Sequence, residues 1–377
     1  MNARKKESGG LKPKDRVLRA IALKEPDMVP MYVTITPELA EKVARTMGIE
    51  SYTLADSPLS QNRISFHEIL TELGNDVVGI GACSPEADPV QNLGGGYTSD
   101  EWKIKFRKVG YYTEQVEYPM ADAETVADIA RFPFPEPLEK GRFDLARRVA
   151  EQYGEQYAIC GDLECTIFEA SWHLTGLEKL LMDLTMEKDY VFELMNRVQE
   201  YSVGVGKELI GMGADILWLG DDMGTQRGML ISPEMWRKYF KERMRRIIES
   251  LKAESNEVKV AYHCCGSYFP IIPDLIEIGI DILNALQPTA KDMEVGRLKE
   301  LFGERVTLFG GMDVQDVLPF GTMDDVEREV RRVITAAGAG GGLLLAGSHN
   351  LQLDVSVEKL FRIFEIARKD GVYPLSG

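Results

Sequence analysis

Short apolar runs that alternate with helix-like segments are the feature that most restricts the fold of this 377-residue chain. Eight runs are strand-like, at residues 28–34, 76–82, 157–160, 214–219, 258–263, 281–285, 306–309 and 343–346. Many of them are almost continuously apolar, which is typical of parallel strands that are covered on both faces. Eight strand–helix alternations predict one (β/α)8 barrel rather than an open doubly wound sheet.

The helix-like segments carry start and stop signals. Ser232 precedes Pro233, and this pair predicts an N-cap followed by a first-turn proline. Thr322 and Ser356 precede two later segments with helical apolar periodicity and are predicted N-caps. Gly371 follows the second of these segments and is a predicted C-cap. Three of the predicted helices therefore have defined ends.

About 75 residues separate the second and third predicted strands, which is far longer than an ordinary connection. Residues 101–109 and 111–118 alternate in polarity around Gly110, and this pattern predicts a β-hairpin. We therefore expect an insertion at about residues 84–156 within a single barrel domain of residues 15–377. The basic residues 1–14 are expected to form a disordered tail.

The net charge of −16, from 44 Lys+Arg and 60 Asp+Glu, argues against a nucleic-acid partner, because nucleic acid repels an acidic surface. Five cysteines are too few for a disulfide scaffold. Neither a signal peptide nor an apolar run long enough to span a membrane is evident. We expect a cytoplasmic protein with reduced thiols and no membrane association.

In a (β/α)8 barrel the chemistry lies at the C-terminal ends of the strands. The polar residues predicted there are Cys83, Asp162, Glu164, Asp221, Asp222, His263, Cys265, Gln287, Asp313, Ser348, His349 and Asn350. We predict acid–base roles for Asp222 and Glu164. Substrate-binding roles are predicted for Asp162, Asp221, Gln287, Asp313 and Asn350. A solvated strand end and an Asx-turn are the alternatives for the carboxylates.

The spacing of these residues says which side chains share a face. Residues two apart on a strand point to the same side, so His263 and Cys265 project together, whereas only one of Asp221 and Asp222 enters the cavity. An imidazole and a thiolate on one face form half of a tetrahedral zinc site. The alternative is a pair of buried thiols beside a histidine with a backbone acceptor.

The third metal ligand must come from another strand. Asp221 or Asp222 after the fourth predicted strand and Ser348 or His349 after the eighth are the candidates, and His349 is the better chemical ligand among them. Cys165 and His173, which follow the third strand, are interpreted as structural.

Taken together, these motifs resemble the uroporphyrinogen decarboxylase superfamily along nearly the whole chain. The resemblance rests on residues 15–20 (DRVLRA), 27–30 (DMVP), 180–184 (LLMDL), 230–236 (LISPEMW), 263–266 (HCCG), 308–313 (LFGGMD) and 347–350 (GSHN). It implies a (β/α)8 barrel with a hairpin-bearing insertion.

The superfamily contains decarboxylases and zinc-dependent corrinoid methyltransferases. Decarboxylases of this group carry an N-terminal arginine-rich motif, but residues 29–36 of this chain contain no arginine. The methyltransferase branch carries H-x-C and a distant cysteine. His263 and Cys265 match the first part, whereas Ser348 followed by His349 stands where the cysteine is expected.

The resemblance therefore implies a methyltransferase of the O-demethylase type, with Zn²⁺ held by His263, Cys265 and either His349 or Asp222. It implies a corrinoid (methylcobamide) supplied by a separate carrier protein, a small methylated or methoxylated substrate, and a homodimer. A metal-free decarboxylase and a non-catalytic corrinoid- or tetrapyrrole-binding protein are the alternatives.

Overall fold

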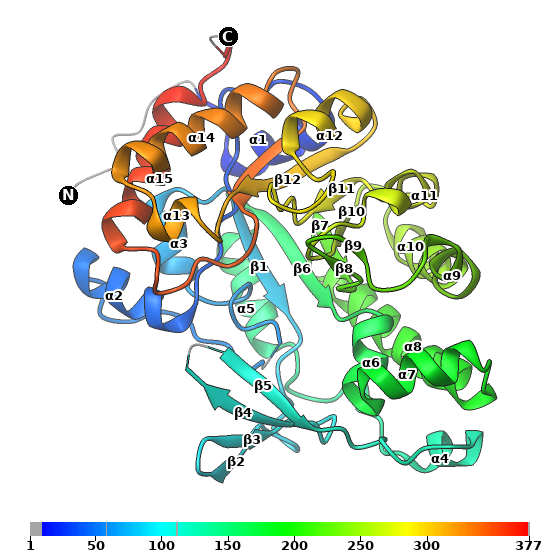
Figure 1. Ribbon diagram of the computed structural model, residues 1–377. Helices are drawn as coiled ribbons and strands as arrows, with labels where there is room; N and C mark the ends of the chain where they lie inside the picture. Colours follow the sequence, from blue (N-terminus) through cyan, green and yellow to red (C-terminus); the bar gives the residue numbers. More distant parts are fainter. Residues whose placement is uncertain (1–9, 58, 111, 376–377) are drawn as a thin grey trace.

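The computed structural model describes residues 10–57, 59–110 and 112–375. Its centre is a parallel half-barrel of seven strands in a TIM-barrel-like arrangement (Figure 1). In spatial order the strands are β1 (Val77–Gly81), β6 (Ala158–Glu164), β7 (Ile216–Gly220), β10 (Lys259–His263), β11 (Ile282–Asn284), β12 (Thr307–Met312) and β13 (Leu343–Gly347). All seven coincide with predicted strands, and nearly all their residues are buried, as their apolar sequences require.

The predicted first strand, at residues 28–34, is irregular, so the prediction of eight regular strands was wrong at this position. Met31 forms a single parallel bridge with Leu345 of β13. On the other side, the Asp76 carboxylate accepts the Met31 N–H, and the Asn75 side chain bonds to both backbone groups of Val33. Because side chains replace part of the backbone ladder, the segment lies beside β13 without pairing as a full strand.

Helices cover the outside of the sheet (Figure 1). They are α1 (Pro13–Ile21), α2 (Pro37–Met47), α3 (His67–Leu73), α4 (Val126–Arg131), α5 (Asp144–Tyr153), α6 (Phe168–Thr175), α7 (Leu177–Thr185), α8 (Asp189–Gly211), α9 (Pro233–Trp236), α10 (Glu242–Glu254), α11 (Ile272–Glu277), α12 (Val295–Phe302), α13 (Val317–Phe320), α14 (Met323–Ala337) and α15 (Val357–Asp370). A π-helical turn (Arg237–Lys241) joins α9 to α10, and a 3₁₀ turn (Phe269–Ile271) precedes α11.

The predicted helix starts are confirmed. Ser232, Thr322 and Ser356 each accept a backbone N–H of the first turn of their helix. None of the described helices combines the length and the apolar character that crossing a bilayer requires. Residues 1–9 of the predicted basic tail lie outside the described residues, and α1 begins at Pro13.

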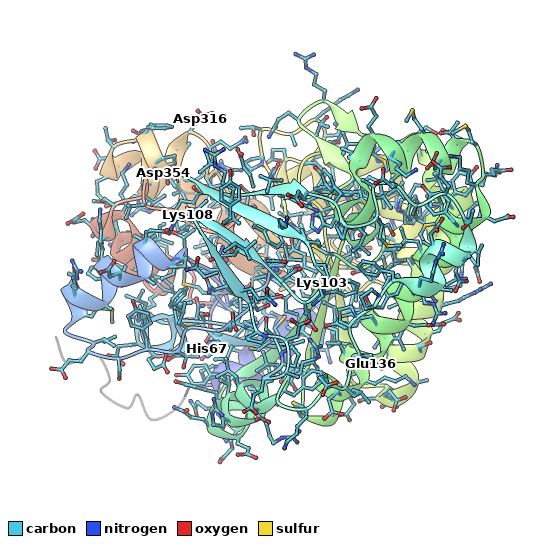
Figure 2. All side chains as sticks on the ribbon, turned by 90° about the horizontal axis from the view of Figure 1, so that it is seen from below. His67, Lys103, Lys108, Glu136, Asp316 and Asp354 are labelled. Carbon is cyan, nitrogen blue, oxygen red and sulfur yellow. The ribbon has the colours of Figure 1, made fainter. Side chains whose placement is uncertain are left out.

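The long connection between β1 and β6 contains an antiparallel sheet of four strands: β2 (Gln91–Gly94), β3 (Tyr97–Ser99), β4 (Lys105–Val109) and β5 (Tyr112–Glu117). The predicted hairpin corresponds to β4 and β5. Seen from below, this insertion sheet lies across the molecule, with Lys103 and Lys108 labelled along it (Figure 2). Lys108 reaches Glu38 of α2 at 2.8 Å, so an ion pair links the sheet to the barrel helices. A further short ribbon, β8 (Gly224–Thr225) with β9 (Gly228–Met229), follows β7.

Aromatic side chains fill the inside of the parallel sheet. The rings of Tyr32 and Phe309 stack with centroids 5.5 Å apart, and the Trp218 ring meets Phe309 edge-on at 5.1 Å. This aromatic layer supports the C-terminal ends of the strands, because the His263 ring lies 5.5 Å from that of Trp218.

Asp100, at the turn between β3 and β4, should make the stability of the folded protein depend on pH. It is buried, its Oδ1 accepts the Ile104 N–H at 2.9 Å, and burial raises its pKa to about 7. Between about pH 4 and pH 7 the native protein then holds a proton that the unfolded chain has released, so this group lowers stability as the pH rises. Asp100→Asn keeps the hydrogen-bond acceptor but cannot become charged. The Tm of the variant minus the Tm of wild type should therefore increase from about pH 4 to about pH 7 and then level off.

The measurement is Tm by circular dichroism across this range. Asp122→Asn, which removes one charge at an exposed position, is the control and should not reproduce the trend. A constant difference between Asp100→Asn and wild type at every pH would contradict the buried titration.

Candidate metal centre

The ends of β7 and β10 bring three donor side chains together. His263 is the last residue of β10, Cys265 follows two residues later, and Asp222 follows β7. Their ligand atoms all lie within 4.8 Å of one another. The Cys265 Sγ and the Asp222 Oδ1 are each 3.6 Å from the His263 Nε2. The expectation that His263 and Cys265 share a face is therefore confirmed.

These separations fit a tetrahedral zinc ion. Zinc–nitrogen bonds of about 2.0–2.1 Å and zinc–sulfur bonds of about 2.3 Å place the nitrogen and sulfur about 3.6 Å apart, and nitrogen and oxygen about 3.4 Å apart. The observed 3.6 Å for both pairs is close to these values. Nitrogen, sulfur and oxygen donors are also the types that zinc prefers.

Neighbouring residues orient the His263 ring. The Asn284 amide nitrogen donates to the Phe309 carbonyl at 3.0 Å, which directs the Asn284 Oδ1 to the His263 Nδ1 at 2.5 Å. Because Oδ1 can only accept, the neutral ring carries its proton on Nδ1, and in this tautomer Nε2 offers its lone pair to a ligand. The ring is thus held in the tautomer that a metal site needs.

The loop after β10 is held by the residues that were predicted to line the site. The Cys265 N–H donates to the Asp222 Oδ1 at 2.6 Å, and the Gly266 N–H donates to the Gln287 Oε1 at 2.8 Å. Gly266 has a φ of +72°, and a Cβ there would lie 2.6 Å from the Gly224 backbone. The Cys264 Sγ faces away and accepts the Met223 N–H, so the two adjacent thiols have different surroundings.

A buried ion-pair cluster lies beside the three donors. Arg63 pairs with Asp162 at 2.8 Å and also with Glu164, whose Oε1 is 3.6 Å from the His263 Nε2. Burial raises the pKa of the Glu164 carboxyl, although the charges of Arg63 and His263 oppose that rise. Burial alone would lower the pKa of Arg63, but the two carboxylates raise it above its ordinary value. Asp162 and Glu164 share a face, as the period-two spacing predicts.

Asp221 and Asp222 point to opposite sides, as expected. Asp221 is fully buried and accepts the N–H groups of Ile167 and Glu169 at 3.0 Å, which places it at the start of α6. Burial raises its pKa to about 7. The Asp222 N–H donates to the Glu169 Oε2 at 3.0 Å, while its carboxylate faces His263.

The remaining predicted residues lie around the mouth of the barrel. His349 and Asn350 line a small cavity together with His263, and the Thr34 hydroxyl donates to the Asn350 Oδ1 at 2.5 Å. His349 does not join the three-donor group within the described residues. The Asp313 carboxylate accepts the Gln315 N–H at 2.8 Å within the turn after β12.

A larger cavity lies on the other side of the ion-pair cluster. Its walls come from the ends of β1 and β6, the turn before β4, α6 and α8. Asp162 and Glu164 line it, whereas Arg63 and His263 line the smaller cavity. The Arg63 cluster is therefore the wall between the two.

Sequence reasoning missed three residues of this centre: Arg63, Asn284 and Glu169. Arg63 comes from an irregular loop before α3, where no periodic pattern indicates which way a side chain points. Asn284 lies in a predicted strand, and its alignment with His263 across the β10–β11 pair depends on the strand register. Glu169 could have been found, because it stands four residues before His173 on one helix face.

Removing Arg63 tests the ion-pair cluster. Arg63→Met leaves two buried carboxylates without their cation, and we expect it to lower the free energy of unfolding by about 3–5 kcal/mol. Adding Asp162→Asn and Glu164→Gln to the same chain should restore part of this loss. Urea unfolding measures both effects.

The matched control is Arg197→Met, because the Arg197 side chain is 44% exposed and pairs with Glu193 on the surface of α8. That change should cost below about 1 kcal/mol. Equal effects of the two substitutions would show that the Arg63 cluster contributes no more than a surface pair.

Comparison with known proteins supports the interpretation of the fold. The sequence profile of the uroporphyrinogen decarboxylase (URO-D) family matches residues 108–369. A methylated-thiol–coenzyme M methyltransferase from Methanosarcina mazei is 23% identical over 167 residues, and this match spans 44% of the chain but only 42% of that relative's length. A solved structure of a methyltransferase from Methanosarcina mazei has a TM-score of 0.68 and 18% identity, and the alignment covers 95% of this chain and 99% of that one. The chain therefore belongs to the uroporphyrinogen decarboxylase (URO-D) family.

Proposed function

We propose that this protein is a zinc-dependent methyltransferase that moves a methyl group between a small methylated or methoxylated compound and a corrinoid held by a separate carrier protein. The observation that carries the proposal is the arrangement of Asp222, His263 and Cys265 at separations that suit a tetrahedral metal. Similarity to the methylated-thiol–coenzyme M methyltransferase points to the same reaction class.

In this proposal His263, Cys265 and Asp222 hold the zinc ion, which supplies a Lewis acid for the heteroatom that carries or receives the methyl group. Asn284 orients the His263 ring so that Nε2 faces the other donors, and Gln287 holds the loop that carries Cys265. Glu164, with its Oε1 3.6 Å from the His263 Nε2, is positioned to exchange a proton with the same heteroatom. His349 and Asn350 border the space in which the small substrate binds.

The walls of the two cavities favour an uncharged or cationic substrate. Neither lysine nor arginine is among the described residues that line the larger cavity, which contains Asp100, Glu101, Asp162 and Glu164. In the smaller cavity the Arg63 guanidinium is already paired with two carboxylates. A porphyrinogen with many carboxylates would find few free cations here, which argues against the decarboxylase alternative. The overall charge of −16 is compatible with docking of a carrier protein that has a basic surface.

Zinc content and methyl transfer test the proposal together. Purified protein should contain about one zinc ion at this centre and should methylate cob(I)alamin from a methoxylated, methylamine or methylthiol compound, which visible absorbance follows. Cys265→Ala should lose that zinc ion and lower the rate by 10²-fold or more, because it removes a metal ligand (an order-of-magnitude expectation).

The control is Cys264→Ser, which changes the adjacent thiol but keeps an acceptor for the Met223 N–H. It should retain zinc and activity. Full methyl transfer by metal-free protein would contradict the proposal. Loss of a carboxylate from uroporphyrinogen without added metal would favour the decarboxylase instead.

A further inference from the structure

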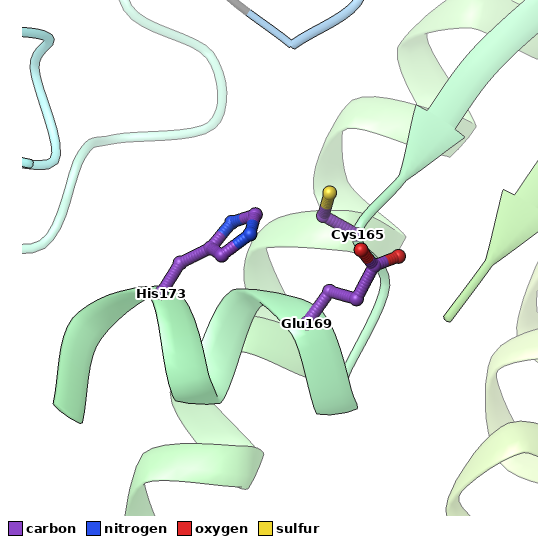
Figure 3. A group of neighbouring side chains, drawn as sticks. All are labelled: Cys165, Glu169 and His173. Atoms are coloured by element: carbon purple, nitrogen blue, oxygen red, sulfur yellow. The ribbon is translucent and has the colours of Figure 1, made fainter. Parts of the chain in front are cut away.

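A second group of nitrogen, sulfur and oxygen donors lies next to the His263 centre. Cys165 directly follows β6, and Glu169 and His173 lie one turn apart on α6. One ligand atom from each of the three lies within 4.8 Å of the other two. Figure 3 shows the His173 ring, the Glu169 carboxylate and the Cys165 thiol facing a common space. The spacing C-x₃-E-x₃-H keeps Glu169 and His173 on the same side of the helix.

The His173 side chain is a second, independent indication that a ligand binds to this group of donors. Its side chain is more than nine-tenths buried, and its Nδ1 has no hydrogen-bond partner among the described residues. Burial lowers its pKa to about 4, so the ring is neutral at pH 7 and offers a lone pair. Buried polar atoms are rarely left without a partner.

His67 shows that an unpartnered ring is not sufficient for a site. Its Nε2 is also buried without a partner, and burial lowers its pKa to about 4 as well. Among the described residues, however, no thiol and carboxylate pair lies near it to form a three-donor group. It comes from α3 (Figure 2), so it is a matched control histidine.

The charges around Glu169 favour a cation. Its Oε2 accepts the Asp222 N–H, which leaves the other carboxylate oxygen available. The carboxyl groups of Asp222, Glu164 and Asp221 lie close enough to act on it electrostatically, so Glu169 stands in a region rich in acidic groups. Negative charge at this depth is costly without a counter-ion, and a divalent cation would remove that cost.

We propose that Cys165, Glu169 and His173 form a second binding site for a divalent cation of the zinc type, separate from the His263 centre and open to the larger cavity. Cys165 and His173 both line that cavity, so an ion can reach them from it. Donors of a tetrahedral zinc ion lie about 3.4–3.6 Å apart, so atoms that are within 4.8 Å of one another have to approach by at most about 1 Å. The site would hold its cation whether or not the His263 centre transfers methyl groups.

Zinc stoichiometry tests this proposal directly. Full-length protein is stripped with a chelator, reloaded with Zn²⁺, desalted and analysed by plasma mass spectrometry. Wild type should hold about two zinc ions per chain, while His173→Gln and Glu169→Gln should each hold about one. Glu169→Gln keeps the acceptor for the Asp222 N–H and is the milder change. Cys265→Ala should also hold about one, and the double variant Cys265→Ala/His173→Gln close to none.

Cobalt titration supplies a second measurement that does not depend on activity. Wild type should show thiolate-to-cobalt charge transfer in two steps, with one step lost in Cys165→Ser and the other in Cys265→Ala. His67→Gln should retain both steps. Failure of methyl transfer with two metal steps intact would count against the proposed function alone.

One zinc ion per wild-type chain, unchanged by His173→Gln, would overturn the second site. A single thiolate step that Cys165→Ser does not reduce would do the same. The zinc content of the wild-type protein tests the second site by itself, so the test does not depend on whether every variant folds.

Discussion

Carboxylates outnumber the cations that face them at the ends of β6 and β7. The arrangement of the whole site depends on which group offsets the negative charge of each carboxylate. Asp162 and Glu164 are compensated by the guanidinium of Arg63. Asp221 is compensated by backbone N–H groups at the start of α6. Asp222 and Glu169 receive single backbone N–H groups. The compensation is weakest for the last two, and each of them belongs to a group of possible metal ligands.

Parallel strands make this concentration of charge inevitable. Every strand of the sheet ends at the same edge, so polar residues that follow β6, β7 and β10 meet there, although Cys165 and Cys265 are about 100 positions apart in the sequence. The rings of Tyr32, Trp218 and Phe309 form an apolar layer beneath them. These rings also line the smaller cavity, and their low polarity strengthens the electrostatic contacts of the donors above them.

Much of the fold follows from patterns in the sequence. Seven predicted strands and the hairpin of β4 and β5 were correct. A strand buried on both faces leaves a continuous apolar run in the sequence, and a strand buried on one face leaves an alternation of apolar and polar residues. The first strand was predicted with the same reasoning, and it failed because Asn75 and Asp76 use side chains to occupy the backbone groups of residues 31–33. Nothing in an apolar run indicates that a side chain from another segment will take the place of the backbone hydrogen bonds to a neighbouring strand.

The sequence by itself determined which neighbours along the chain share a face. His263 with Cys265, Asp162 with Glu164, and the divergence of Asp221 from Asp222 all follow from the two-residue period of an extended strand, which is a local property of the backbone. Only the tertiary structure decided which distant residues join them. Arg63, Asn284 and Glu169 reach the site from a loop, a neighbouring strand and a helix, and their positions depend on strand register and helix packing, which no local period encodes.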